Sequence, residues 1–557
     1  MGFKVYMRNL NLVTKSLPSK FSFTVMMFVF TSTPADIYAS EVTPDQLEFR
    51  RQATQRMIFD RSQAIRLAGL WPAKVVGLDV MHPPVGLQVN APRLTIEDGR
   101  LQISAKKAAT ATRWIGGFNP FAVYDVAVNK FNGYGEIGLM FRDTDAENRI
   151  TATLVVEDGQ YRSFHCVITK EGTEVERQDF DLPKPWMSHA PICLRVQMVA
   201  VGVNLYVEQA ARSTLIGRMD FVKYFDLRNK ALMRRFEFCL HTSLEANSSV
   251  EIDEATAVLS PGIGQADIRN VTYEDGAPLF KDGRLWMLMT VRGGGLPHPM
   301  QGVFSIDPSV FDIRFEGIIL YDRGDGLLRN DLASNIFYDR NHNQWRGFTT
   351  GFSSYGDPEK KEKKQIWAVQ SSKEPLQGLS IMKAKPIGLV GMHEDPQCIY
   401  DSKAGKWRML LCESHKGFKA VMRQSDKWDG TYEKIAGPVE VNSTGTQIQK
   451  IGQKYYVLFG SADRKVYIYT YPDLKRQGQL NMHLPPWDDK INTRVWPNVI
   501  PLPEGYPARY IALMMDRLNF PGMQGANWTY GAMYLYHAHP AGGDQLDYEY
   551  KPGQSDN

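Results

Sequence analysis

The chain has 557 residues, enough for more than one domain, because a single hydrophobic core stops growing at about 250–300 residues. With 43% hydrophobic and 23% charged residues, its composition is ordinary for a soluble protein. Lys and Arg (65) exceed Asp and Glu (61) by only four charges, which argues against nucleic acid or an anionic membrane as the main partner.

Residues 1–40 have the pattern of a secretory signal peptide. The first 20 residues carry four basic residues and no acid, residues 21–31 form an apolar run, and small residues follow as far as Ala39 and Ser40. A basic region, a short apolar region and a small-residue exit are typical of such a signal. The run is shorter than the ~20 apolar residues that a membrane span needs. We therefore expect an exported protein, secreted or periplasmic, without a membrane span.

Residues 41–74 predict a helical leader. Thr43 is suited to be the N-cap, Pro44 the first helical residue, and Gln46 completes a capping box. Gly69 is the expected stop of this helix.

Residues 75–262 change to a period of two, the pattern of strands with one buried face. Asp98 and Gly99 form the turn of a predicted hairpin. Many short strands with almost no helical pattern predict a β-sandwich of the jelly-roll kind. The progression resembles the concanavalin- or laminin-G-like domains attached to carbohydrate-active enzymes, which implies glycan binding or a buttress for the neighbouring domain. The expected strands cover residues 94–96, 101–103, 122–128, 137–142, 151–156, 163–169, 194–198, 204–208, 236–241 and 250–258.

Five degraded copies of one pattern follow a Pro/Gly-rich boundary at residues 260–264. Each copy has a short strand, a turn and a second strand, spaced from the next copy by 56, 63, 50 and 52 residues. Periods of ~40–50 residues with four strands each are the signature of a β-propeller. We therefore predict a five-bladed β-propeller over residues 263–545 and a tail at 546–557; a second sandwich with coincidental hairpins is the alternative. The copies are marked by Asp275, Asp331, Glu394, Thr444 and Trp496.

Acidic residues mark three of these copies. The innermost strands of a propeller run along its channel, so we expect Asp275, Asp331 and the Glu394-Asp395 pair to meet at one end. Like charges held together raise one another's pKa values, which keeps one carboxyl protonated. Glycosidic bond cleavage needs such a pair, an acid with a base or nucleophile. A strand-end cap or an exposed charge is the alternative for any single acid.

The same region resembles the five-bladed propeller glycoside hydrolases of the family 43, 32 and 117 type. The resemblance rests on Asp275 with Pro278 and the Asp-Gly turn that follows them. It also rests on Arg329-Asn330-Asp331 and on the run from His393 to Cys398. It covers roughly residues 265–540.

The resemblance implies a role for each acid. Asp275 would be the base or nucleophile, and Asp331 would orient the sugar and tune pKa values. Glu394 would be the acid, with Asp395 as its substitute. Sugar contacts are expected from further residues, each of which could equally lie in a loop or pair with an acid: His298, His393, Arg494, Trp496 and Trp528.

The predicted fold class is all-β, a sandwich followed by a five-bladed propeller. The predicted function is an exported glycoside hydrolase that cleaves a plant or algal polysaccharide or oligosaccharide. A non-catalytic glycan-binding propeller and a propeller polysaccharide lyase are the alternatives. The glycan, the linkage, the stereochemical outcome and the oligomeric state stay open.

The five cysteines show no CxxC pair and no nearby histidine cluster. A zinc site or a dense disulfide framework would need such spacing, so we expect buried single cysteines. No cofactor or metal is expected, although a structural or channel-bound ion is left open. The cysteines are Cys166, Cys193, Cys239, Cys398 and Cys412.

Overall fold

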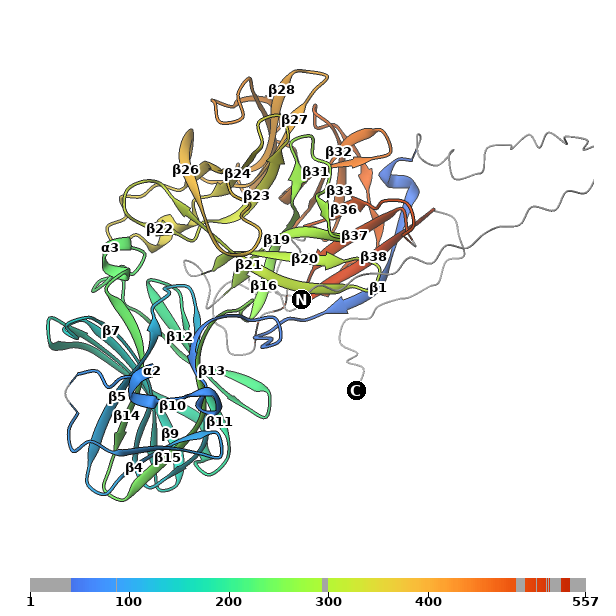
Figure 1. Cartoon of the computed structure of the whole chain (residues 1–557). Helices are drawn as coiled ribbons and strands as arrows, with labels where there is room; N and C mark the ends of the chain where they lie inside the picture. Colours follow the sequence, from blue (N-terminus) through green and yellow to red (C-terminus); the bar gives the residue numbers. More distant parts are fainter. Residues whose placement is uncertain are drawn as a thin grey trace, which may run out of the picture. The chain divides into compact units, whose positions relative to one another are not determined.

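The computed structural model describes residues 42–540 except 87, 293–298, 487–495, 507, 517, 519 and 521–531 (Figure 1). The expected signal peptide and C-terminal tail lie outside the described residues. The described chain is almost entirely β-structure, as predicted, and forms a sandwich and a five-bladed propeller. None of its helices is long and apolar enough to cross a membrane. All five cysteines are buried and unpaired.

Two antiparallel sheets form the sandwich. One sheet has the order β10 (Thr173–Met187), β9 (Gln160–Lys170), β8 (Arg149–Glu157), β7 (Gly135–Asp143), β14 (Phe236–Leu244), β5 (Ala109–Gly117). The other has the order β13 (Arg212–Asp220), β12 (Gly202–Gln209), β11 (Ile192–Met198), β6 (Val123–Asn132), β15 (Ser248–Leu259), β4 (Arg100–Ala105), β3 (Arg93–Glu97), with β2 (Ile65–Leu70) paired to β15.

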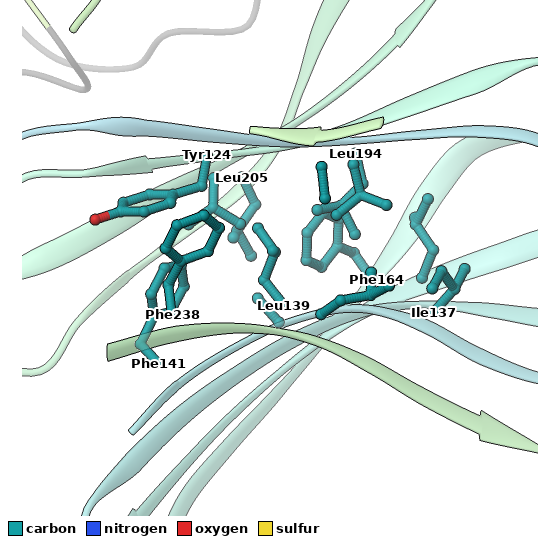
Figure 2. Packing of buried hydrophobic residues seen from close by; sticks show 14 of the residues in the cluster. Tyr124, Ile137, Leu139, Phe141, Phe164, Leu194, Leu205 and Phe238 are labelled. Atoms are coloured by element: carbon teal, nitrogen blue, oxygen red, sulfur yellow. The ribbon is translucent and has the colours of Figure 1, made fainter. Parts of the chain in front are cut away.

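The sandwich core lies between these sheets and explains the period of two. Every second residue of β7 is fully buried, at Ile137, Leu139 and Phe141. Figure 2 shows these side chains facing Leu194 and Leu205 of the opposite sheet. Such apolar burial contributes roughly 25 cal/mol per Å² removed from water, which makes this core the main source of stability in the sandwich.

The propeller has five four-stranded blades whose innermost strands contact one another around the channel. From the inside outward, the blades are: blade one, β16 (Gly264–Asn270), β19 (Arg284–Arg292), β20 (Met300–Asp307), β21 (Asp312–Asp322); blade two, β23 (Leu332–Asp339), β24 (Gln344–Thr350), β25 (Gln365–Ser371), β26 (Gly378–Val390); blade three, β27 (His393–Asp401), β28 (Lys406–Ser414), β29 (Phe418–Ser425), β30 (Glu433–Ala436); blade four, β31 (Thr444–Ile451), β32 (Lys454–Gly460), β33 (Val466–Thr470), β34 (Arg476–Gln479); blade five, β36 (Asn498–Pro501), β37 (Tyr510–Met515), β38 (Met533–Pro540), β1 (Leu47–Gln55).

The predicted N-terminal helix is wrong, because its residues close the propeller as a strand. β1 pairs antiparallel with β38 and completes blade five, as the blue strand beside the red ones shows (Figure 1). Leu47 and Phe49 alternate into the core, and the capping box survives only in a 3-10 turn at Pro44–Gln46. The unpaired edge of β38 overrides the local helix signal, since tertiary pairing outweighs propensity.

A bulge recurs at one position of the innermost strands. In four blades the strand register shifts there, and one residue has a left-handed φ: Asp267 (55°), Ala333 (53°), Asp395 (59°) and Gly445 (63°). The residue two positions after each of these four bulges is polar and fully buried: Arg269, Asn335, Gln397 and Gln447. Asn498 is the buried polar residue of the innermost strand in blade five. This alignment fixes which residues share one level of the channel.

Candidate functional site

The aligned bulges identify the first-blade counterpart of Asp395. That residue is Asp267, which has the same place in β16 and a similar φ. Asp331 directly precedes β23, and Glu394 directly precedes Asp395, so all four acids lie where the innermost strands begin. Each of the four is at most 9% exposed. Burial of several carboxylates at one end of the channel is the feature that the sequence predicted, with a different first-blade member.

Asp275, the predicted base, does not join these acids. Its carboxylate lies 2.9 Å from Arg340, which follows the last residue of β23, whereas Asp331 precedes the first. Eight strand residues at about 3.3 Å each therefore separate the two ends by about 25 Å. Asp275 is also 43% exposed. The prediction of a three-acid cluster that includes Asp275 is wrong, because the innermost strand of blade one precedes this residue.

Residues 273–278, which we call the plug, contact the far ends of several blades. Arg340 binds Glu274 at 2.8 Å, and the Tyr400 amide donates to the Glu274 carbonyl at 2.6 Å. The Tyr455 hydroxyl donates to the Asp275 carbonyl at 2.7 Å. Gly276 has φ 81° and lies so close to Ile399 that a Cβ atom would approach its Cγ2 to 2.9 Å. The plug therefore joins blades two, three and four opposite the acid cluster.

Asp395, one of the four acids where the innermost strands begin, has a raised pKa. Its burial and the charges of Glu394 and Asp267 raise the pKa of Asp395 to about 7. Its Oδ2 accepts hydrogen bonds from the Gly445 amide at 2.9 Å and from the Cys412 thiol at 3.7 Å. These bonds fix the carboxyl between blades three and four. At neutral pH this group holds a proton for a substantial part of the time.

Glu394 lies in a different environment one residue away. Its carboxylate forms an ion pair with Lys364, and both residues are less than 9% exposed. The Lys364 ammonium lies 4.3 Å from the ring centre of Phe352, a cation–π distance. The negative charge of Glu394 is one of the causes that raise the pKa of the neighbouring Asp395.

Asp331 is fully buried and held by two donors. Arg323 Nη2 donates to its Oδ2 at 2.6 Å, and the Ser353 amide donates to its Oδ1 at 3.0 Å. Arg323 in turn stacks 3.9 Å from the ring centre of Trp367. The Asp331 carboxylate therefore has a fixed orientation and is paired with a guanidinium.

Asp267 lies beside a fully buried guanidinium. The Thr290 hydroxyl donates to its Oδ2 at 2.6 Å. Arg269 Nη2 donates to the carbonyls of Asp395 and Thr446, each at 3.2 Å. Burial lowers the pKa of Arg269 to about 10, against the raising effect of Asp395 and other acids. The guanidinium therefore links blades one, three and four at the level of the acids.

Two of the five residues predicted to contact sugar, Trp496 and His393, lie in the described part of the chain. Trp496 is 3% exposed, belongs to a hydrophobic core cluster and has its ring centre 4.9 Å from the Arg269 guanidinium. His393 begins β27, with Nδ1 3.9 Å from the Glu413 carboxylate, and burial lowers its pKa. His298, Arg494 and Trp528 lie outside the described residues.

Sequence reasoning missed Asp267, Arg269 and Lys364. The Asp-Gly hairpin after residue 278 is a strong sequence signal. The first repeat was therefore marked at Asp275, which comes after β16 in the chain. The buried polar residues of the five innermost strands recur at intervals of 66, 62, 50 and 51 residues, which is no more regular than the predicted marks. Spacing alone therefore does not identify Asp267; the bulge in the structure does. Within the described part of the chain, no group of three or more His, Cys, Asp or Glu could hold a metal ion.

No protein-family model matches this sequence, and no curated protein matches it. Several solved glycoside hydrolases are similar to it in structure. A family 117 enzyme of the marine bacterium Zobellia galactanivorans has 11% identity and a TM-score of 0.35, over 49% of this chain and 84% of that one. The GH43_1 enzyme of Xanthomonas citri, solved with xylotriose, has 10% identity and a TM-score of 0.36, over 50% and 88%.

The Bacteroides ovatus xyloglucan PUL GH43B has 13% identity and a TM-score of 0.24, over 29% of this chain and 34% of that one. This chain thus spans about a third of that protein. The likeness to all three concerns the fold alone.

Proposed function

We propose that this protein is a glycoside hydrolase whose centre is the acid cluster of Asp267, Asp331, Glu394 and Asp395. The observation that carries the proposal is the divided environment of two adjacent acids. Burial and neighbouring charge raise the pKa of Asp395 to about 7, whereas Lys364 pairs with Glu394. A carboxyl group with a pKa raised in this way suits the general acid, which glycosidic bond cleavage combines with a second carboxylate as base or nucleophile.

In this proposal the protonated Asp395 donates its proton to the leaving glycosidic oxygen. Asp267, across the channel level on blade one, acts as the base or nucleophile. Glu394 raises the pKa of the acid, and Asp331 holds the sugar in place through its fixed carboxylate. These roles replace the sequence-based assignment of Asp275 as base and Glu394 as acid. Export through the signal pattern of residues 1–40 belongs to the same proposal.

An activity screen tests the function. The purified protein is incubated with plant and algal glycans and oligosaccharides, and reducing ends are measured together with ultraviolet absorption. We expect new reducing ends without an unsaturated product. An absorbing, unsaturated product would instead identify a lyase and contradict the proposal.

A glycan-binding propeller without catalysis is the second candidate. It is favoured by the hydrogen bonds that occupy Oδ2 of Asp395 and by the ion pair that occupies Glu394. This candidate predicts that the same glycans bind and are recovered unchanged. Isothermal titration of the wild-type protein beside the activity screen separates the two.

A further inference from the structure

A groove with a volume of about 810 Å³ lies over blade two. One wall is the connection between β13 and β14 of the sandwich, which contributes Asp226 and Arg228. The Arg228 carbonyl accepts from the Leu328 amide at 2.8 Å, and Arg228 Nη1 donates to the Ser353 carbonyl at 3.3 Å. The groove is therefore built jointly by the sandwich and the propeller, and its size suits a ligand of several sugar units.

The groove adjoins the proposed catalytic centre. Arg323 lines it and binds Asp331 at 2.6 Å through Nη2. Lys363 and Gln365 also line it, on either side of the Lys364 that pairs with Glu394. Two of the four cluster acids are thus held by residues in or next to the wall of the groove.

The fixed charges of the groove balance. Its described lining includes five basic and five acidic residues. Arg228 binds Asp226 at 2.7 Å, and Arg329 binds Asp325 at 2.6 Å. Each of the buried arginines that line the groove therefore already has a carboxylate partner. An anionic ligand that bound one of these arginines would have to displace its carboxylate partner, which in a partly desolvated site costs more than it gains.

Glu362 is the central member of this network. Its carboxylate contacts Arg323 and, at 3.2 Å, Arg329 Nε, and it accepts from the Ser353 hydroxyl at 3.2 Å. One carboxylate thus neutralises two guanidinium groups.

The groove also has apolar surface. Trp367 is 9% exposed beneath Arg323, and the remaining wall includes Leu327, Pro386 and the half-exposed Val390. Apolar patches beside fixed donors and acceptors match the two faces of a pyranose or furanose ring, with its C–H groups and its hydroxyls.

We infer that this groove binds an uncharged saccharide and is the substrate groove of the proposed hydrolase, on which the inference rests. Neutral hydroxyls can add hydrogen bonds to the charged network without breaking an ion pair. Uronates and sulfate esters are disfavoured because no basic charge exceeds the acidic charge in the lining. The sandwich then serves substrate binding through its β13–β14 connection.

Filling the groove tests its location. Val390→Trp puts an indole into the groove, and Ile381→Trp is the matched control, since Ile381 is on the same strand, is similarly exposed (47% against 49%) and does not line the groove. Binding is measured by isothermal titration with xylohexaose, arabinohexaose and cellohexaose in an Asp267→Asn background that prevents turnover. We expect V390W to weaken binding of the neutral hexasaccharide at least about tenfold, which corresponds to ~1.4 kcal/mol, and I381W to change it less than about threefold. No binding of any neutral hexasaccharide, or equal binding by both variants, overturns the inference.

Changing one charge tests the specificity. Glu362→Gln removes the shared carboxylate, and Glu359→Gln, 64% exposed at the rim, removes the same charge away from the arginines. With hexagalacturonate as the anionic probe, we expect E362Q to gain affinity about tenfold over the unsubstituted groove and E359Q to gain less than about threefold. Tighter binding of hexagalacturonate than of the neutral probes by the unsubstituted groove would overturn the inference.

The two proposals fail separately. Hydrolysis of a neutral glycan that V390W leaves unchanged would refute the groove and preserve the hydrolase. Binding of a neutral hexasaccharide that V390W abolishes, without turnover by the wild-type protein, would refute the hydrolase and preserve the groove.

Discussion

At the scale of single residues, the pKa of Asp395 makes stability depend on pH in an unusual direction. The group titrates near 3.8 when exposed and near 7 when folded. Between these two pH values the Asp395 carboxyl is protonated in the folded state but ionised in the unfolded state. The contribution of Asp395 to the free energy of unfolding is therefore full below pH ~4 and is lost as the pH rises to ~7. Each pH unit removes at most about 1.4 kcal/mol of unfolding free energy. We expect the difference between wild type and Asp395→Asn, measured by urea denaturation from pH 4 to 8, to fall with this sign; a constant or rising difference would contradict it.

The Lys364–Glu394 pair gives a second prediction at this scale. Removing one member of a buried ion pair leaves an uncompensated charge and costs about 3–5 kcal/mol. We expect Glu394→Gln to destabilise the protein by about this amount, and Lys364→Met with Glu394→Gln to recover most of it. Urea denaturation of the wild type, both single variants and the double variant measures the coupling. Additive losses would show that the two groups do not depend on each other.

At the scale of elements, β1 controls closure of the propeller. Phe49 is 1% exposed between blade five and its neighbour, whereas Gln52 of the same strand is exposed. Truncating a buried aromatic costs about 3–5 kcal/mol, so we expect Phe49→Ala to destabilise by that amount. Gln52→Ala is the control and is expected to stay within about 0.5 kcal/mol. If guanidinium denaturation showed equal, small effects for both, β1 would not be part of the folded propeller.

The plug is tested by two glycines with similar backbone angles. Gly276 (φ 81°) faces Ile399, and Gly283 (φ 72°) has no heavy atom within 4 Å of a Cβ position. Both alanine substitutions incur the left-handed penalty of roughly 1–2 kcal/mol. Only Gly276→Ala adds a clash, so we expect it to lose at least about 1 kcal/mol more than Gly283→Ala in thermal denaturation. Equal losses would show that the plug does not pack against blade three.

Element signals in the sequence were reliable where local pattern and tertiary role agreed. The sandwich strands and the five blades follow from periodicity and from recurring hairpins, and the boundary at residues 260–264 falls between β15 and β16. The β1 segment could not be predicted, because its strand state depends on an edge almost 500 residues away. β16 was not predicted either, because it lines a polar channel. Its buried residues include Gln265, Asp267 and Arg269, so its sequence lacks the apolar pattern of a core strand.

At the scale of the whole molecule, the omission of β16 explains why the first-blade acid was predicted at the wrong position. Asp331, Glu394 and Asp395 each lie where the innermost strand of a blade begins, because the marks predicted for their blades fall on innermost strands. Asp275 was assigned to the same cluster from a hairpin signal, although the plug places it at the opposite end of β23. The ion pair of Lys364 with Glu394 and the groove over blade two depend on loop packing, for which the sequence has no periodic signal.

The most direct test of the proposed centre compares two acid-to-amide substitutions in blade one and its extension. Asp267→Asn removes the proposed base, and Asp275→Asn removes a plug acid that pairs with Arg340, just after the last residue of β23. Turnover of the best glycan from the activity screen is measured for both folded variants. We expect D267N to lose about 10²–10⁴-fold in rate, the range for a catalytic acid or base, and D275N to stay within about threefold of the wild type. Full activity in D267N, or its loss in D275N alone, would contradict a catalytic centre where the innermost strands begin.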